Sequence, residues 1–191
     1  MSYIQLTWVC WGMFIVAWIL GAIYISSNGQ ETTKRRSRYD WLVLAALIWS
    51  VMHYAPNRYL SFSLFHIAWL RMAGSILLIA ATVFTLWSRW VLGKMWATNA
   101  AVKKEHKLVT RGPYGITRHP IYTGVLGMIL GSAMSLDQGV IFLGFIMVLL
   151  FFMNRIRNEE QLMEMTFGEQ YNRYRKRVPQ LVPGLKLFNR K

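Results

Sequence analysis

The sequence is poor in cysteine and in acidic residues. Its single cysteine, Cys10, excludes a disulfide framework and a cysteine-based metal site, and we expect no metal ion. The glycine-rich strand–turn–helix fingerprint of dinucleotide-binding folds is also missing. Only 8 acidic residues accompany 22 basic ones, giving a net charge of +14. Because no RNA- or DNA-binding motif accompanies this charge, and the cations adjoin apolar segments, we expect contact with anionic lipid headgroups and not with nucleic acid.

Long apolar segments are abundant, and hydrophobic residues make up 54% of the chain. An uncharged segment of about 20 residues can cross a bilayer as a helix. We expect about five spans, the last two of them short: Ile4–Ile25, Trp41–Tyr54, Leu64–Trp87, Tyr122–Met134 and Gly139–Met153. Only Ser135–Gln138 separates the last two, so they should form an antiparallel hairpin. The sequence therefore predicts an all-α, polytopic transmembrane helix bundle with a C-terminal helical hairpin, in which Cys10 is a core residue.

The distribution of basic residues predicts the orientation in the membrane, because short cytoplasmic loops are enriched in Lys and Arg. Basic residues outnumber acidic ones four to two in residues 30–40, seven to one in residues 88–120 and nine to four in residues 154–191. The loops at 55–63 and 135–138 carry only Arg58 and Asp137. We therefore expect the N-terminus outside, and the C-terminus and the basic segments in the cytoplasm.

The chain divides near Trp87 into two regions. Residues 1–87 form an N-terminal membrane region of three spans, and residues 88–191 contain the last two spans and the specific polar segments. Residues 88–104 are expected to form either an interfacial helix or an extension of the third span. In the first region, His53 and His66 flank the outer loop and should be solvated. Arg71 lies deeper and should either reach toward water or pair inside the bundle.

Residues 106–122 (HKLVTRGPYGITRHPIY) have the wrong composition for a lipid-facing helix. The two glycines and Pro113 favour a turn, and Pro120 directs His119 away from helical geometry and suits the first turn of a new helix. Irregular backbone at a membrane is tolerated where protein or a water-filled cavity satisfies its polar groups. The segment is therefore either a binding site or a purely structural loop.

The tail after Met153 is predicted to continue the fifth span as a helix from about Asn154 to Lys176, broken at Val178–Pro179. Arg155 lies four residues before Glu159, so both side chains share one helix face. They should lie near the membrane depth of His119 and Tyr122, because both polar segments adjoin the cytoplasmic mouth of one hairpin. The sequence thus predicts one site built from segments 106–122 and 155–183.

Six ordered motifs in these two segments resemble the isoprenylcysteine carboxyl methyltransferase family and the related membrane phospholipid methyltransferases. The motifs are His106-x-Leu108-Val109, Gly112-x-Tyr114, Arg118-His119-Pro120-x-Tyr122, Arg155-x-x-x-Glu159-Glu160, Phe167-Gly168-x-x-Tyr171-x-x-Tyr174 and Val178-Pro179. Any one of them is weak, but the ordered set is hard to obtain by chance. The resemblance covers roughly the last 90 residues, and the first three spans share only hydropathy with the family.

The resemblance implies a catalytic region at 88–191 with a cytoplasmic S-adenosylmethionine site between the loop and the last hairpin. Its implied cofactor-binding residues are His106, Lys107, Leu108, Val109, Tyr114, His119, Pro120, Ile121, Tyr122 and Glu159. Arg155 is implied to bind the substrate, and Arg155, Glu159 and His119 are the implied catalytic residues. A further polar contact of the family falls near Asn99.

The implied reaction is methyl transfer to a lipophilic acceptor that enters from the bilayer, most simply the carboxylate of an isoprenylcysteine-like compound. An amine headgroup of a phospholipid is the alternative, and it would need a base such as His119 or Glu160. Two other classes stay open, an NADPH-dependent sterol-type reductase and a non-enzymatic adaptor or transporter subunit. A short five-span chain is the prokaryotic form of such proteins, which implies the inner (plasma) membrane.

Overall fold

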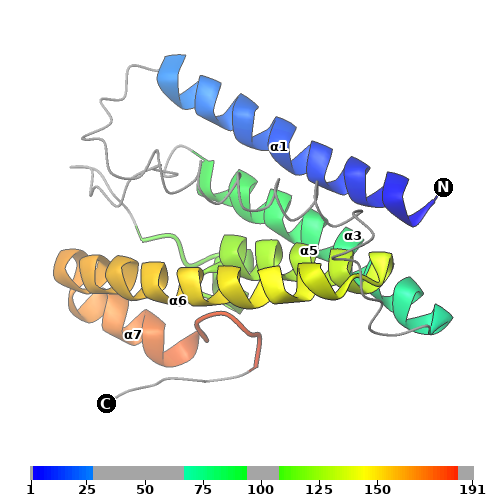
Figure 1. Ribbon diagram of the computed structural model, residues 1–191. Coiled ribbons are helices and arrows are strands. Elements are labelled where there is room, and N and C mark those ends of the chain that lie inside the picture. Colours follow the sequence, from blue (N-terminus) through cyan, green and yellow to red (C-terminus); the bar gives the residue numbers. More distant parts are fainter. Residues whose placement is uncertain (1, 28–66, 94–107, 185–191) are drawn as a thin grey trace.

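The computed structural model describes residues 2–27, 67–93 and 108–184, and every regular element in these ranges is a helix. Two long helices, α1 (Tyr3–Ser27) and α3 (Ala68–Leu92), precede the one-turn helix α4 (Pro113–Ile116). They are followed by α5 (Pro120–Leu136), α6 (Gly139–Phe167) and α7 (Glu169–Arg177). Figure 1 shows α1, α3, α5 and α6 as a bundle, with α7 beside one end of α6.

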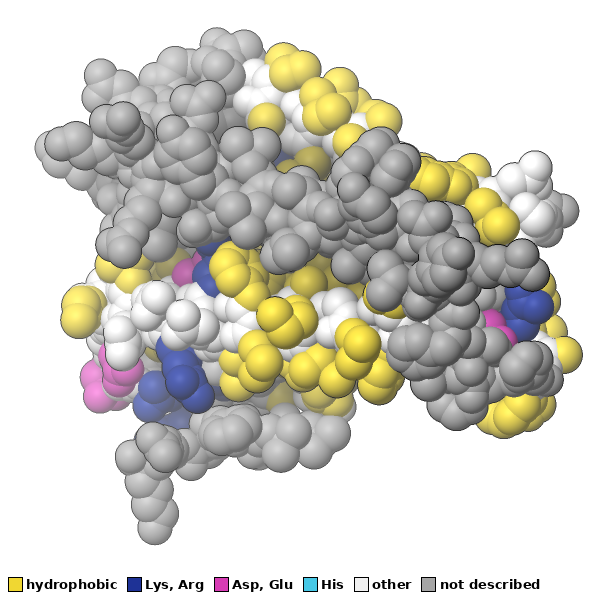
Figure 2. Space-filling view, viewed as in Figure 1, with side chains coloured by type: hydrophobic (Ala, Val, Ile, Leu, Met, Phe, Trp, Pro, Cys, Tyr) yellow, Lys and Arg dark blue, Asp and Glu magenta, His cyan; other side chains and the backbone are white. Residues whose placement is uncertain are grey.

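Three of the helices are long and apolar enough to cross a membrane: Tyr3–Tyr24, Ala68–Leu92 and Gly139–Phe167. The apolar helix α5 is shorter, at 17 residues. The predicted first, fourth and fifth spans therefore fall on helices, and so does the predicted third span from Ala68 onward. The predicted second span lies outside the described residues, as do the loops at 30–40 and 55–63, His53, His66 and Asn99. Large apolar side chains of α1, α3 and α6 are exposed, as a lipid-facing surface requires (Figure 2).

The hairpin of α5 and α6 is confirmed, with a tight turn at Asp137. This residue adopts the left-handed conformation (φ 55°, ψ 48°), which Asp tolerates better than most residues. The amide of Gln138 donates to the carbonyl of Ala133 at 3.1 Å, which closes the end of α5. The third span reaches Leu92, so a helical extension accounts for the start of segment 88–104.

The tail departs from the prediction of one helix to Lys176. The helix α6 runs without interruption through Asn154 but ends at Phe167, because Gly168 adopts φ 48° and ψ −121°, a conformation that side-chain-bearing residues avoid. The chain then reverses, and α7 lies beside the last turns of α6 (Figure 1). The end of α7 at Arg177, just before Val178–Pro179, is as predicted.

Glycines bring α3 and α5 into very close contact, as small residues do between membrane helices. A Cβ atom on Gly131 of α5 would lie 2.6 Å from the amide nitrogen of Leu78 and 2.9 Å from the carbonyl oxygen of Gly74 on α3. A Cβ on Gly127 would lie 2.9 Å from the Cβ of Ala81. The two backbones therefore fix the position of α5, and with it the start of α5 at Pro120.

The helix α1 packs on this pair through a few buried residues. Cys10 is buried in the core, and Nε1 of Trp11 donates to Oγ of Ser132 at 3.1 Å. One turn further along α5, Nε of Arg71 donates to the carbonyl of Ser135 at 3.3 Å, and its guanidinium lies 4.5 Å from the ring centre of Tyr3. Arg71 is thus partly buried in the first turn of α3, and it bonds to α5 there.

The close approach of α3 and α5 gives a first prediction. Replacing Gly131→Ala should destabilise the protein by roughly 1–3 kcal/mol, because the new methyl group meets rigid backbone. Thermal unfolding of the purified protein in detergent measures this effect. The matched control is Gly12→Ala on α1, where a Cβ meets nothing within 4 Å. Equal unfolding temperatures for the two variants would contradict the packing described.

Candidate active site

The loop before α5 has the irregular backbone that its composition predicts. Gly112 has φ 62°, and Pro113 then occupies the first turn of α4. Thr117 is extended, and His119 (φ −123°, ψ 60°) immediately precedes Pro120 at the start of α5. Pro120 lacks an amide hydrogen, which the first turn of a helix does not need. This backbone directs His119 and Tyr122 toward α6.

Tyr122, Arg155 and Glu159 form a hydrogen-bonded triad between α5 and α6. The hydroxyl of Tyr122 donates to Oε1 of Glu159 at 2.6 Å and accepts from Nε of Arg155 at 2.8 Å. Nε of Arg155 also lies 3.0 Å from the same Glu159 oxygen. The predicted pairing of Arg155 with Glu159 on one helix face is thus observed, and Tyr122 joins them. The triad balances its charges and fixes the tyrosine ring.

His119 lies between two carboxylates. Its Nε2 is 3.2 Å from Oε1 of Glu160, and its Nδ1 is 3.8 Å from Oε2 of Glu159. The imidazole ring is nearly parallel to the ring of Tyr122, with 5.8 Å between centres and an angle of 13°. Because an ionised carboxylate can only accept, Nε2 donates to Glu160. The orientation of the ring is therefore set by Glu160.

Arg118 is the main residue that sequence reasoning did not assign to the site. Its side chain is 4% exposed, and its Nε and Nη2 both lie 2.8 Å from Oε1 of Glu160. Its Nη1 donates to the carbonyls of Arg175 at 3.0 Å and of Val178 at 2.8 Å. The signal was present in the Arg118-His119-Pro120 motif, but only the fold reveals the acceptors. Arg118 therefore positions the carboxylate of Glu160, which in turn orients His119.

Residues 178–181, here called the tail strap, are hydrogen-bonded along the loop before α5. The amides of Arg118 and His119 donate to the carbonyls of Pro179 and Gln180, at 2.8 and 3.2 Å. The hydroxyl of Thr117 donates to the same Gln180 carbonyl at 3.1 Å. The hydroxyl of Thr123 in α5 donates to the carbonyl of Leu181 at 2.6 Å. The irregular backbone of the loop is thereby satisfied by protein, as a membrane boundary requires.

An aromatic cluster on α7 supports the loop from the other side. The hydroxyl of Tyr174 donates to the carbonyl of Tyr114 at 2.6 Å. Tyr171, Tyr174 and Val178 are buried together, and Leu108 packs against them. Burial raises the pKa of Tyr114, Tyr171 and Tyr174 above the ordinary tyrosine value. These phenols are therefore neutral near pH 7, which suits binding and support but not base catalysis.

The predicted site residues differ in how they are placed. His119, Tyr122, Arg155 and Glu159 come together in one network, and Tyr114 and Leu108 lie in the adjoining aromatic cluster. Pro120 is fully buried, and Val109 and Ile121 are half-buried. His106 and Lys107 lie outside the described residues. Within residues 2–27, 67–93 and 108–184, no group of three or more His, Cys, Asp and Glu side chains is placed to hold a metal ion.

The family model for phospholipid methyltransferases matches residues 69–170. This range includes all of α3 except its first residue, the loop, the hairpin and all of the network around His119. The chain belongs to the phospholipid methyltransferase family.

Curated relatives of this chain are isoprenylcysteine methyltransferases by name. It is 33% identical over 118 residues to protein-S-isoprenylcysteine O-methyltransferase B of Arabidopsis thaliana, which is 60% of either chain. It is 44% identical over 81 residues to the Schizosaccharomyces pombe enzyme of the same kind, covering 42% of this chain and 34% of that one. The chain thus spans between about a third and three fifths of the length of these two relatives.

The fold is also that of a solved membrane protein. The structure of a eukaryotic intramembrane Ras methyltransferase, isoprenylcysteine carboxyl methyltransferase, matches with a TM-score of 0.67 at 20% identity. The match covers 98% of this chain and 69% of the other. Together with its long apolar helices, this fold makes the chain an integral membrane protein.

The position of Arg118 gives a second prediction. Replacing Arg118→Met should cost roughly 3 kcal/mol of stability, because Glu160 is left largely buried without its cation. The comparison is Arg175→Gln, which breaks the more exposed pair with Glu164 (3.4 Å) and should cost less than about 1 kcal/mol. Both variants are measured by thermal unfolding in the same detergent. Similar costs would show that Arg118 does not carry the structural role assigned to it.

Proposed function

We propose that the protein is a membrane methyltransferase that transfers a methyl group from S-adenosylmethionine to a lipophilic acceptor with a carboxylate, such as an isoprenylcysteine-like compound. The observation that carries the proposal is the network of His119, Tyr122, Arg155 and Glu159 at one end of the bundle. It joins the loop to α6 beside the apolar helices, where a water-soluble cofactor and a lipid can meet.

Family membership supports methyl transfer as the reaction class. The family model covers the whole network, and the relatives named above are methyltransferases. This favours methyl transfer over the NADPH-dependent reduction and the non-enzymatic role that the sequence left open.

The residues present fit S-adenosylmethionine. The side chain of Glu159 is 24% exposed, and its Oε1 is engaged by Tyr122 and Arg155. A partly exposed carboxylate of this kind suits the cofactor's ammonium group, and the tyrosine faces suit its adenine or sulfonium. We assign the lining of the cofactor site to His106, Lys107, Leu108, Val109, Tyr114, His119, Pro120, Ile121 and Tyr122. When bound, the cofactor supplies an activated methyl group on a cationic sulfur.

The protein's part in such a reaction is mainly orientation. An acceptor carboxylate is already ionised near neutral pH, so no base is needed, and in-line geometry and exclusion of water set the rate. We assign the binding of this carboxylate to Arg155, whose planar guanidinium suits it better than a lysine would. Nε of Arg155 donates to Tyr122 and to the carboxylate of Glu159, which offsets much of the positive charge of the guanidinium. Arg155 can therefore orient the acceptor carboxylate while leaving it nucleophilic. The lipophilic part of the acceptor enters laterally from the bilayer, and the site faces the cytoplasm.

The role of Glu159 gives a third prediction. Replacing Glu159→Gln should weaken binding of S-adenosylmethionine by at least about tenfold, since a charge-assisted hydrogen bond contributes roughly 1.5–3 kcal/mol. Isothermal titration calorimetry on the purified protein in detergent measures this affinity. Glu164→Gln is the matched control, on the same helix but paired with Arg175 away from the triad. Unchanged affinity in the Glu159 variant would remove this assignment.

The role of Arg155 is tested through the acceptor. Replacing Arg155→Lys keeps the charge but loses the planar fork, so KM for a prenylcysteine acid should rise by about tenfold or more. The affinity for S-adenosylmethionine should change much less. Radiolabelled methyl transfer at varied acceptor concentration separates KM from kcat. A variant that loses cofactor affinity but keeps its acceptor KM would place Arg155 on the cofactor instead.

A phospholipid amine is the second candidate acceptor. It is favoured by the family that contains the chain and by the carboxylates that flank His119. An amine must lose a proton before it attacks, and the candidate bases are His119 and Glu160. Mass spectrometry of methylated products from prenylcysteine acids and from phosphatidylethanolamine distinguishes the two acceptors. Methylation of phosphatidylethanolamine alone would replace the carboxylate proposal.

A further inference from the structure

The charges of α7 are distributed unevenly along its axis. Glu169 lies in its first turn, whereas Arg175, Lys176 and Arg177 lie in its last turn. Arg175 is partly exposed and turned toward α6, where its Nη1 lies 3.4 Å from Oε2 of Glu164. Arg173, Lys176 and Arg177 are exposed. The structural cation of this helix is thus separate from a set that faces outward, here called the basic rim: Arg173, Lys176 and Arg177.

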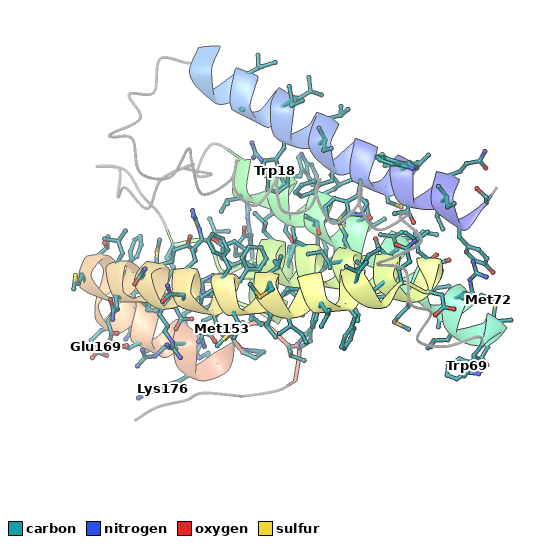
Figure 3. The ribbon with its side chains drawn as sticks, viewed as in Figure 1. Trp18, Trp69, Met72, Met153, Glu169 and Lys176 are labelled. Carbon is teal, nitrogen blue, oxygen red and sulfur yellow. The ribbon has the colours of Figure 1, made fainter. Side chains whose placement is uncertain are left out.

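The reversal at Gly168 carries the basic rim back toward the membrane helices. In Figure 3, Glu169 lies near the tip where α6 ends, and Lys176 belongs to the later part of α7. Immediately after Arg177, the tail strap bonds to the loop and to the first turn of α5, with Leu181 bonded to Thr123. The end of α7 therefore lies at the level where the apolar helix α5 begins.

Exposed apolar side chains also lie at this level. Val182, just beyond the tail strap, is 45% exposed, and Ile116 in α4 is 41% exposed. Figure 2 shows Lys and Arg side chains grouped at this end of the molecule, with acidic side chains beyond them at the tip. Cations beside exposed apolar side chains, with anions farther away, match the order of phosphate and hydrocarbon in a bilayer surface.

We propose that the basic rim binds the phosphate of anionic phospholipids in the leaflet on the side of the candidate site. The net basic charge of the whole chain does not specify this contact, because much of that charge lies elsewhere. The basic rim specifies this contact, because it places three outward-facing cations of one short helix at the level of the headgroups. The proposal is independent of the reaction assigned to the site, because none of the three side chains takes part in the network around His119.

The test is a titration of the full-length protein in neutral detergent with phosphatidylglycerol, followed by thermal unfolding. The unfolding temperature should rise, and phosphatidylcholine should produce a much smaller rise. In the variant Arg173→Gln/Lys176→Gln/Arg177→Gln, the half-saturating concentration of phosphatidylglycerol should increase by about tenfold or more. Glutamine has a helix propensity similar to that of Lys and Arg, so α7 should persist.

Two further variants separate charge from structure. Lys176→Gln alone should raise the half-saturating concentration about two- to fivefold. Arg175→Gln, which removes the cation of the same helix that is paired with Glu164, should leave the half-saturating concentration within about twofold of the native value. Equal stabilisation by the two lipids, or an unchanged half-saturating concentration in the triple variant, would overturn the proposal. Equal stabilisation by glycerol phosphate would also overturn it, because the site would then bind soluble anions without a lipid.

Discussion

The buried guanidinium of Arg118 joins three parts of the chain that are distant in sequence. It bonds to Glu160 on α6, to a carbonyl of α7 and to the tail strap, while its own residue belongs to the loop before α5. A buried cation is tolerated only where its donors meet acceptors. The loop, α6 and the tail are therefore held in one relative arrangement. His119 follows Arg118 directly, so the candidate site depends on this arrangement.

The site's charges largely balance one another. Arg118 pairs with Glu160, and Arg155 pairs with Glu159, with His119 between the two carboxylates. Ionisable groups beside a hydrocarbon layer are costly unless they are paired, so this balance explains how they can lie at the end of apolar helices. The balance also suits a ligand that carries both a positive and a negative group. Such a ligand can pair its positive group with a carboxylate of the network and its negative group with an arginine, so that no side chain is left with an unpaired charge.

Much of the helical structure and one ion pair of the site could be predicted from the sequence, because these features depend on residues that are close together in the chain. Apolar length predicted the helices, Pro120 predicted the start of α5, and four-residue spacing predicted the pair of Arg155 and Glu159. The break at Gly168 was missed, since a glycine inside a helical pattern is compatible with either continuation or reversal, and packing of α7 decides between them. Arg118 was missed for the same reason: its acceptors are 42 to 60 residues away along the chain.

The tail strap has a consequence for how the protein is made. Arg118, His119 and Thr117 leave the ribosome well before residues 178–181, which supply their backbone acceptors. Until then these groups must stay hydrated at the membrane surface while the hairpin of α5 and α6 inserts. Insertion and maturation of the site are therefore separate events in time. A released chain that ended before Val178 would contain all of the described membrane helices and still lack these acceptors.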